Sequence, residues 1–385
     1  MTEPEPAAPI FEQTSGTTQS AEQTIDEGKG RIFPCEGCGA DLKFHIGQQQ
    51  LKCQYCGFEK EIEIGEDARI EEQDFRTILA RMRELHSRDR HDETEQNEVR
   101  CESCGGNVVF VVSLTSSECP YCTSPMQLKN VHTAENRIPV DGVLPFLIPK
   151  ETSRKNLSEW VSSRWFAPND FLKRGVEGRF NGIYLPYWTF DSLTATRYSG
   201  QRGEHYYVTV GSGKNKRSVR RTRWYSASGA FQRFFDNVLV LATTGMRHKL
   251  ISNLEPWPLH KCVPFTQQVL AGYLARTYET ELDAGFFAAK QRIEAVIETD
   301  VRRHIGGDTQ RIHSIHSRYD AITFKHLLLP VWLLAYRYKE NVYQVVVNAG
   351  TGEVQGDRPY SWTKITLAIL AGAVIAVTLG ILFSK

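Results

Sequence analysis

The stretch "IYLPYWTFDSLTATRYSG", residues 183–200, is rich in aromatic and β-branched residues and ends at a glycine. Such residues favour pleated, partly buried strands. Further runs of the same character, separated by Gly and Asn turns, lie at residues 205–210, 222–229, 327–340 and 341–354. The pattern predicts that residues 131–357 form an α+β body with mainly antiparallel strand pairing.

Two helices interrupt these strands, at about residues 151–165 and 281–305. The longer one carries an apolar stripe of Phe286, Ile293, Val296, Ile297, Val301 and Ile305, and it ends before "GGD". An internal repeat is visible around them. "VLPF" at 143–146 precedes a helix and "YLPYW" at 184–188, and "CVPF" at 262–265 precedes a helix and "LLPVW" at 328–332. We expect two helix-then-strand units in one sheet, with each proline at a strand start.

The most basic stretch of the chain is "GKNKRSVRRTRWY", residues 213–225. Its position between two strand-like runs predicts a long hairpin with a basic tip. Trp224 and Tyr225 beside the charges would suit a nucleic-acid backbone and its bases. Two other interpretations are open. The hairpin could contact anionic lipid, or it could be a solvated edge whose charges only prevent pairing with another strand. The candidate residues for an anionic partner are Lys214, Lys216, Arg217, Arg220, Arg221 and Arg223.

Four Cys-x-x-Cys pairs precede the body. Two pairs fourteen residues apart form a four-thiolate unit, and the chain carries this unit twice, in residues 31–65 and 99–130. This spacing predicts two tetrahedral sites, each holding one Zn²⁺, although four thiolates also suit iron. The more apolar insert of the second ribbon favours its packing on the body, which would leave the first ribbon more mobile. The expected ligands are Cys35, Cys38, Cys53, Cys56, Cys101, Cys104, Cys119 and Cys122.

The segments outside the ribbons and the body differ sharply in composition. Residues 1–30 carry six acids, one lysine and no apolar run, which predicts a disordered tail and no signal peptide. Residues 66–98 hold eleven acids and six arginines around a short amphipathic stripe, as in a charged helical linker. Beyond a juxtamembrane segment at 358–364, residues 365–383 contain no charge and are long enough to span a bilayer. A core helix would keep a polar face, and this stretch has none.

These ends predict a tail-anchored topology. The chain would cross the inner, cytoplasmic membrane once, with the bulk of it in the cytoplasm. Overall composition agrees with a globular body, since hydrophobic residues make up 41%, charged residues 24%, and the net charge is +1. A protein that is basic throughout is therefore excluded.

Motifs for common enzymatic chemistry do not occur in the sequence. "GSGKNK" lacks the spacing of a phosphate-binding loop, and neither a Gly-x-Ser-x-Gly elbow nor a His-Glu-x-x-His motif is found. No nucleotide is therefore expected as a ligand. The histidines at 304, 313, 316 and 326 have no carboxylate or cysteine at ligand spacing, and Cys262 suits a small buried position. The sequence predicts a non-enzymatic protein.

The whole pattern resembles a bacterial family labelled zinc-ribbon-containing, TFIIB-type or primosomal helicase-like. The resemblance rests on the double ribbon, "GIYLPYWTFD", "RWYSASG", "LEPWPL", "ITFKHLLLPVWLLAYRY", "VNAGTGEVQGDRPYSW" and the final apolar helix. It implies a cytosol-facing membrane protein whose relatives associate with phage-shock-type and SPFH-type proteins. We therefore expect an adaptor that recruits protein partners to the membrane. A membrane-tethered nucleic-acid-binding protein is the alternative.

Overall fold

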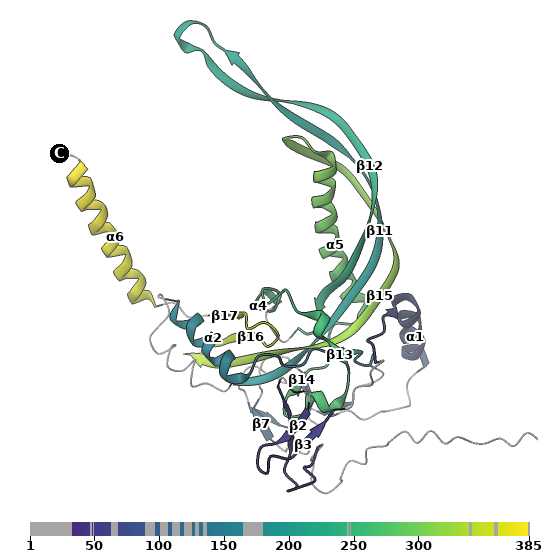
Figure 1. Ribbon diagram of the computed structural model, residues 1–385. Coiled ribbons are helices and arrows are strands. Elements are labelled where there is room, and N and C mark those ends of the chain that lie inside the picture. The colour runs from purple at the N-terminus through teal and green to yellow at the C-terminus, as the bar shows by residue number, and fades with distance from the viewer. Residues whose placement is uncertain are drawn as a thin grey trace, which may run out of the picture.

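The fold was analysed in a computed structural model of the chain. The residues described are 33–46, 48, 50–62, 68–88, 97–100, 107–109, 116–118, 125–127, 131–133, 137–164, 180–244, 246, 248–338, 341–357 and 361–383. They form a mixed α+β structure in which most strands pair antiparallel, as the sequence predicts (Figure 1).

A nine-stranded sheet organises the body, and three of its strands are very long. These are β11 (Phe180–Val210), β12 (Arg217–Leu241) and β15 (Thr309–Tyr338). The central path runs β12-β11-β15-β10-β13, so β11 lies between the other two long strands. The shorter members are β4 (Gln73–Asp74), β10 (Gly142–Val143), β13 (Val263–Pro264), β14 (Leu274–Ala275), β16 (Asn341–Asn348) and β17 (Val354–Gly356).

The internal repeat is present in this sheet. β10 leads through α2 (Lys150–Ser162) to β11, and β13 leads through α5 (Leu282–Ile305) to β15. The two units face each other, because β10 pairs antiparallel with β13 and β11 pairs antiparallel with β15.

The prolines of the repeat do not start their strands, contrary to expectation. Pro186 and Pro330 lie inside β11 and β15. Each is nevertheless next to the end of a ladder, since β12 pairing stops at Tyr187 and β16 pairing stops at Val331. A missing amide is tolerated where a neighbouring strand ends.

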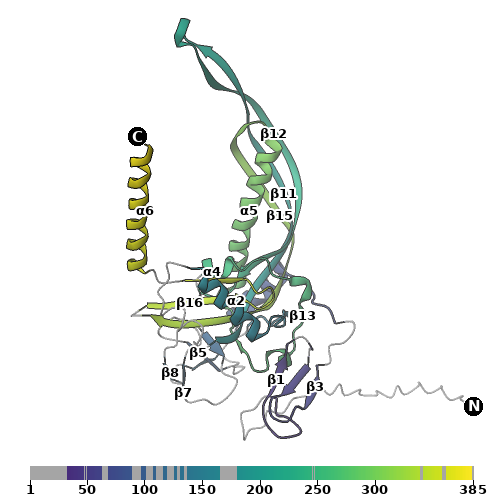
Figure 2. The same cartoon turned by 60° about the vertical axis from the view of Figure 1, so that its left-hand side comes forward.

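The three long strands rise out of the body as a curved arm with α5 along its inner side (Figures 1 and 2). Ile293, Ile297 and Val301 of α5 are buried against aromatic and aliphatic side chains of the arm strands. Asp300 of the same helix forms ion pairs with Arg233 of β12 and Arg303. Most of the apolar stripe predicted for this helix therefore packs on the arm. Phe286 instead packs on Phe75, and Val296 is exposed, contrary to expectation.

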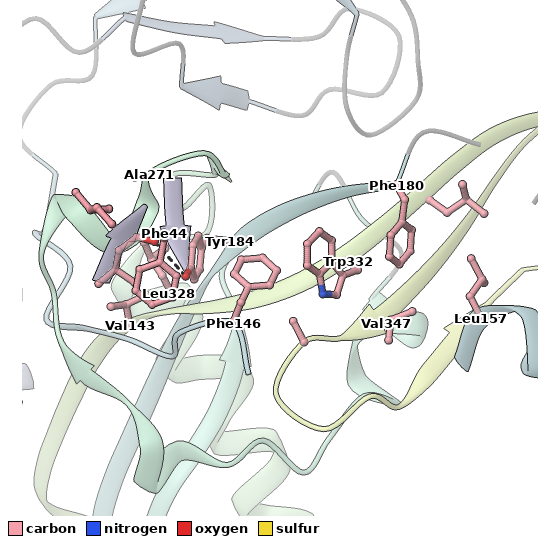
Figure 3. Packing of buried hydrophobic residues seen from close by; sticks show 14 of the residues in the cluster. Phe44, Val143, Phe146, Leu157, Phe180, Tyr184, Ala271, Leu328, Trp332 and Val347 are labelled. Carbon is pink, nitrogen blue, oxygen red and sulfur yellow. Dashed lines mark hydrogen bonds between the residues drawn. The ribbon is translucent and has the colours of Figure 1, made fainter. Parts of the chain in front are cut away.

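The first ribbon is a three-stranded sheet of β1 (Leu42–His45), β2 (Gln50–Cys53) and β3 (Glu59–Glu61). It packs on the body, although the sequence predicts this of the second ribbon, and the relative mobility of the two ribbons stays a prediction. Leu42, Phe44 and Leu51 belong to the same buried cluster as Tyr184 and Leu328 of the body (Figure 3). This contact removes apolar surface of the ribbon from water, so the ribbon and body share one core.

The linker after the ribbon contains α1 (Phe75–Arg88), within the stretch expected to be helical. Phe75 is buried against Phe190, and Ile78, Leu79 and Met82 pack on the same cluster. The remaining short helices are α4 (His248–Ser252), η2 (Gly213–Asn215), η3 (Leu259–Lys261) and η4 (Gln267–Leu270).

Five short strands are described in the region of the expected second ribbon. They are β5 (Asn97–Arg100), β6 (Asn107–Val109), β7 (Ser116–Glu118), β8 (Pro125–Gln127) and β9 (Val131–Thr133). They form a three-stranded sheet, β6-β5-β9, and the pair β7-β8. The four cysteines expected there lie outside the described residues, so the second metal site stays a prediction.

The last helix, α6 (Trp362–Phe383), stands apart from the body in both views (Figures 1 and 2). Its segment Trp362–Leu379 has the length and apolar composition of a membrane span, and none of it is buried against the rest of the described chain. This agrees with a single span by length and composition alone.

Candidate metal centre

Four cysteines of the first ribbon converge on one point. The sulfurs of Cys35, Cys38, Cys53 and Cys56 all lie within 4.8 Å of one another. The Sγ atoms of Cys35 and Cys56 are 3.4 Å apart, and those of Cys38 and Cys53 are 3.5 Å apart. A tetrahedral site with bonds of about 2.3 Å separates its sulfurs by about 3.8 Å. A small outward shift on binding therefore gives the geometry of a four-thiolate zinc site.

Local backbone structure explains how each Cys-x-x-Cys pair presents its sulfurs. In the first turn the Gly39 amide donates to the Cys35 carbonyl over 2.8 Å, and in the second the Gly57 amide donates to the Cys53 carbonyl over 3.2 Å. Both glycines have positive φ, 70° and 76°. Residues with a Cβ rarely adopt this conformation, so a glycine after each pair is needed to close the turn.

The electrostatics of the cluster favour a bound cation. Backbone amides of Cys56 and Tyr55 lower the pKa of the Cys53 thiol to about 6. The Phe58 amide lowers the pKa of Cys56, but the adjacent thiols of Cys35 and Cys38 outweigh it, and that pKa is raised to about 12. The site thus favours the thiolate of Cys53 and disfavours that of Cys56, because ionised sulfurs this close together repel one another. Zn²⁺ bound by Cys35, Cys38, Cys53 and Cys56 would remove that repulsion.

The ribbon is also tied to the body through its backbone. The Phe44 amide donates a hydrogen bond of 3.1 Å to the Ala271 carbonyl. Beside it, the Lys43 side chain lies against Gly272, where an added Cβ would come within 3.0 Å of the lysine. The metal-binding hairpin therefore docks on the body through β1, and its partner strand β2 carries the ligand Cys53.

Lysines on the ribbon already have polar partners. Lys43 Nζ donates to Gln54 over 3.3 Å, Lys52 Nζ is 2.6 Å from a Glu59 carboxylate oxygen, and Lys60 Nζ is 2.9 Å from one of Glu36. The two carboxylates neutralise two of the three ammonium groups. This leaves the ribbon with little free positive charge for a phosphate backbone.

The predicted basic residues gather at the far end of the arm. Lys216 precedes β12 and is exposed, as are Arg217, Arg220, Arg221 and Arg223 at the start of that strand. Lys214 lies in the connecting turn η2. The hairpin tip therefore forms where the sequence predicts it, at the opposite end of the sheet from the first ribbon (Figure 1).

A partly buried polar cluster was missed in the sequence. Lys325 Nζ lies 3.0 Å from Glu72 Oε1 and 3.3 Å from Asp191 Oδ2, and Glu72 also accepts from the Thr323 hydroxyl over 2.9 Å. Hydrogen bonding from Lys325 lowers the pKa of Glu72, and burial raises the pKa of Asp191. These residues are far apart in sequence, so only the fold brings them together. They hold the linker against the body.

His326 is buried in the body and contacts backbone carbonyls. Nδ1 of His326 lies 3.2 Å from the Ile138 carbonyl and 3.1 Å from the Pro139 carbonyl. Burial lowers the pKa of its imidazole to about 4. The neutral ring therefore donates from Nδ1 to this turn. His304 instead stacks on Phe231, with ring centroids 4.6 Å apart.

Comparison with known proteins supports the metal centre. A zinc-ribbon family described as the PriA DNA helicase Cys-rich region (CRR) domain matches residues 35–60. Uncharacterized protein YdjG of Bacillus subtilis (strain 168) is 25% identical over 230 residues. That match covers 58% of this chain and 64% of the relative, less than two thirds of its length. No solved structure matches the chain. The first unit is therefore a metal-binding zinc ribbon.

Proposed function

We propose that the chain is a tail-anchored, cytosol-facing adaptor that recruits protein partners to the membrane and catalyses no reaction. The observation that carries this proposal is α6, which is apolar on all sides and packs against nothing in the described chain. Leu367, Leu370 and Val374 are each more than half exposed. Apolar side chains gain about 25 cal/mol for each Å² removed from water, so such a helix is far more stable within a bilayer.

The residues before the helix support the orientation. Trp362 is mostly exposed at its first turn, where indoles sit at a membrane interface, and Lys364 follows. Arg358 lies just upstream in the sequence, so positive charge collects on the body side. By the positive-inside rule this side is cytoplasmic.

The adaptor role is supported by how the ribbon is used. A zinc site that stabilises a hairpin within the body's own core serves folding, and it leaves the outer face of the ribbon free for protein contact. The partners we propose are phage-shock-type or SPFH-type membrane proteins, as the family resemblance implies. In this proposal the sulfur cluster and the partly buried salt bridges keep the surface that binds the partner rigid.

A membrane-tethered nucleic-acid-binding protein is the second candidate. The match of residues 35–60 to a Cys-rich region of a DNA helicase favours it, together with the basic tip of the arm. The paired lysines of the ribbon weigh against it. We therefore rank the adaptor first.

Crosslinking at the membrane tests the proposal. Full-length protein and the variant Val374→Lys, with Val374→Leu as the matched control, are crosslinked in cells and recovered from alkali-washed membranes. The charged residue at the middle of the span should release the chain into the soluble fraction. Wild type and Val374→Leu should recover defined membrane-protein partners. Recovery of nuclease-sensitive complexes in place of proteins would favour the second candidate, and carbonate-soluble wild type would refute the anchor.

A further inference from the structure

The tip of the arm is a free two-stranded hairpin. The last residue pair between β11 and β15 is Gly203 with Thr309, whereas β11 and β12 stay paired as far as Val210 and Arg217. Residues 204–223 therefore extend past the third strand, and they also extend past Ile305, the last residue of α5. The burial pattern shows no buried residue in the described part of this segment. At its base, the carboxylate of Asp308 accepts from the His205 amide.

The two sides of the tip differ in composition. Cross-strand partners share a side of a sheet. The register places Tyr206 opposite Arg221, Val208 opposite Val219 and Val210 opposite Arg217. These six residues are called the valine face. The other side is more polar, with Tyr207 and Arg220 followed by Thr209 and Ser218.

Positive charge on the valine face is largely uncompensated. Arg217 and Arg221 are exposed, and Arg223 extends the row by one pair towards the body. Glu204, opposite Arg223, already forms an ion pair of 2.9 Å with Arg202. The tip carries six basic residues and this one acid, in a chain whose net charge is only +1. An anionic partner is therefore the chemistry that fits.

Three aromatic rings near the tip are poorly placed to stack on bases, and the fourth, Tyr207, is 70% exposed on the side opposite the valine face. The Arg223 guanidinium lies 5.2 Å from the Tyr206 ring centroid, that of Arg202 lies 5.6 Å from the Tyr225 centroid, and that of Arg311 lies 4.0 Å from a Trp224 ring centroid. Each ring thus has one face occupied by a guanidinium group. Binding of single-stranded nucleic acid relies on open aromatic faces.

The valines at the tip distinguish a bilayer from a nucleic acid. Val210 is 38% exposed at the outermost strand pair, beside Arg217, and Val208 and Val219 are next in line. Tyr206, 37% exposed, follows behind them. Arg217 is paired with Val210, and Lys214 and Lys216 lie in the turn beyond this pair. Valines interleaved with long cationic side chains suit a surface that lies on a lipid interface, where the cations reach phosphates and the valines face the acyl boundary. A phosphate backbone offers no apolar region for the valines.

The arm and α6 rise from the same side of the body, and the arm curves towards α6 in both views (Figures 1 and 2). We propose that the valine face of the arm tip binds the surface of an anionic phospholipid bilayer, with arginines on the headgroup phosphates and valines at the acyl boundary. This second membrane contact rests on the proposed anchor only for the presence of a membrane on that side.

The test uses full-length protein in nanodiscs of phosphatidylcholine alone or with phosphatidylglycerol. Incorporation of the chain is measured first, so a failed anchor is recognised separately. Hydrogen–deuterium exchange of residues 204–223 should slow by roughly tenfold with phosphatidylglycerol, and high salt should reduce the effect, since each arginine adds to surface attraction. Arg217→Gln/Arg221→Gln/Arg223→Gln should abolish the slowing. Arg69→Gln/Arg81→Gln/Arg83→Gln, with the same charge change on exposed linker arginines, should retain it.

Further results distinguish contact with lipid from contact with nucleic acid. Val208→Ser/Val210→Ser should weaken the slowing while keeping its dependence on phosphatidylglycerol, as expected if the valines enter the interface. Equal exchange in both nanodisc types would overturn the proposal. So would a slowing that requires added single-stranded or duplex DNA and is indifferent to lipid, which would assign the tip to nucleic acid.

Discussion

The first ribbon and the arm tip are both antiparallel hairpins, yet they are stabilised in opposite ways. The ribbon hairpin closes on four cysteine sulfurs, buries Phe44 in the body's core, and pairs its lysines with neighbouring side chains. The tip hairpin is held by the pairing between its own two strands and by few other contacts. Its arginines and Val210 are exposed. The difference indicates that a hairpin with satisfied charges serves the fold, whereas one with open charges is available to a partner.

The largest effect should follow removal of the metal site. Cys53→Ser deletes one of the four ligands, and the ribbon should lose its zinc and unfold locally, because structural zinc contributes directly to folding. Metal analysis should show about one zinc fewer per chain, with proteolysis appearing in residues 35–60 and the arm unchanged. Cys262→Ser, a cysteine outside the cluster, should keep the full metal content.

The same metal analysis tests which metal is bound and how its binding depends on pH. Because the pKa of Cys53 is lowered to about 6, its thiolate persists above that pH and is lost as the pH falls through it. Protons and Zn²⁺ compete for the four thiolates, so zinc should be released on acidification, at a pH below the pKa of the free thiol because the bound cation keeps the thiolates ionised. Red protein with an iron-thiolate absorption spectrum would instead identify the iron alternative. A Cys53→Ser protein with undiminished zinc would contradict the ligand assignment.

Truncating one phenylalanine in each region compares burial directly. Phe44 is 4% exposed, and Phe234 on the arm is 59% exposed. Phe44→Ala should cost about 3 kcal/mol or more by leaving a cavity between the ribbon and body, and Phe234→Ala should cost less than about 0.5 kcal/mol. Urea unfolding followed by tryptophan fluorescence measures both. Similar losses in the two variants would mean that the ribbon does not dock through Phe44.

Local signals in the sequence predicted local structure well. The spacing of Cys35, Cys38, Cys53 and Cys56 led to the metal cluster, and the stripe from Phe286 to Ile305 led to α5, because each pattern lies within a short stretch of sequence. The docking of Phe44 on Ala271 and the bridge from Lys325 to Glu72 join residues more than two hundred positions apart. No short-range pattern encodes such pairs. The same reason explains why the ribbon was expected to be mobile.

The bridge at the base of the arm gives an intermediate effect. Lys325→Met leaves the buried Asp191 carboxylate beside Glu72 without its cation. We expect a loss of roughly 2 kcal/mol at pH 7, below the 3–5 typical of fully buried pairs because Glu72 is partly exposed. Urea unfolding at pH 7 and pH 4 measures it. Lys325→Met/Asp191→Asn should recover much of the loss, since the buried charge is then gone.

The pH dependence of that bridge has a definite sign. Burial raises the pKa of Asp191, so the folded protein binds this proton more tightly than the unfolded chain. Its contribution is present at acidic pH and is lost as the pH rises through the window above about 4, the ordinary aspartate value. Lys325→Met should widen this window. A cost that is equal at pH 4 and pH 7 would show that Asp191 stays ionised in the variant.

The smallest change in stability should follow removal of a single exposed cation from either hairpin. Arg221→Gln at the arm tip and Lys52→Gln on the ribbon each remove one exposed cation, and neither should move the Tm by more than about 1 °C. Their signs should differ, however. Lys52→Gln loses its contact with Glu59, whereas Arg221→Gln relieves repulsion from Arg217 and Arg223 on the same side of β12. Thermal unfolding at low salt resolves the two shifts, and added salt should reduce both. Destabilisation by Arg221→Gln would reveal an internal partner for this arginine and would remove the contrast between an occupied hairpin and an open one.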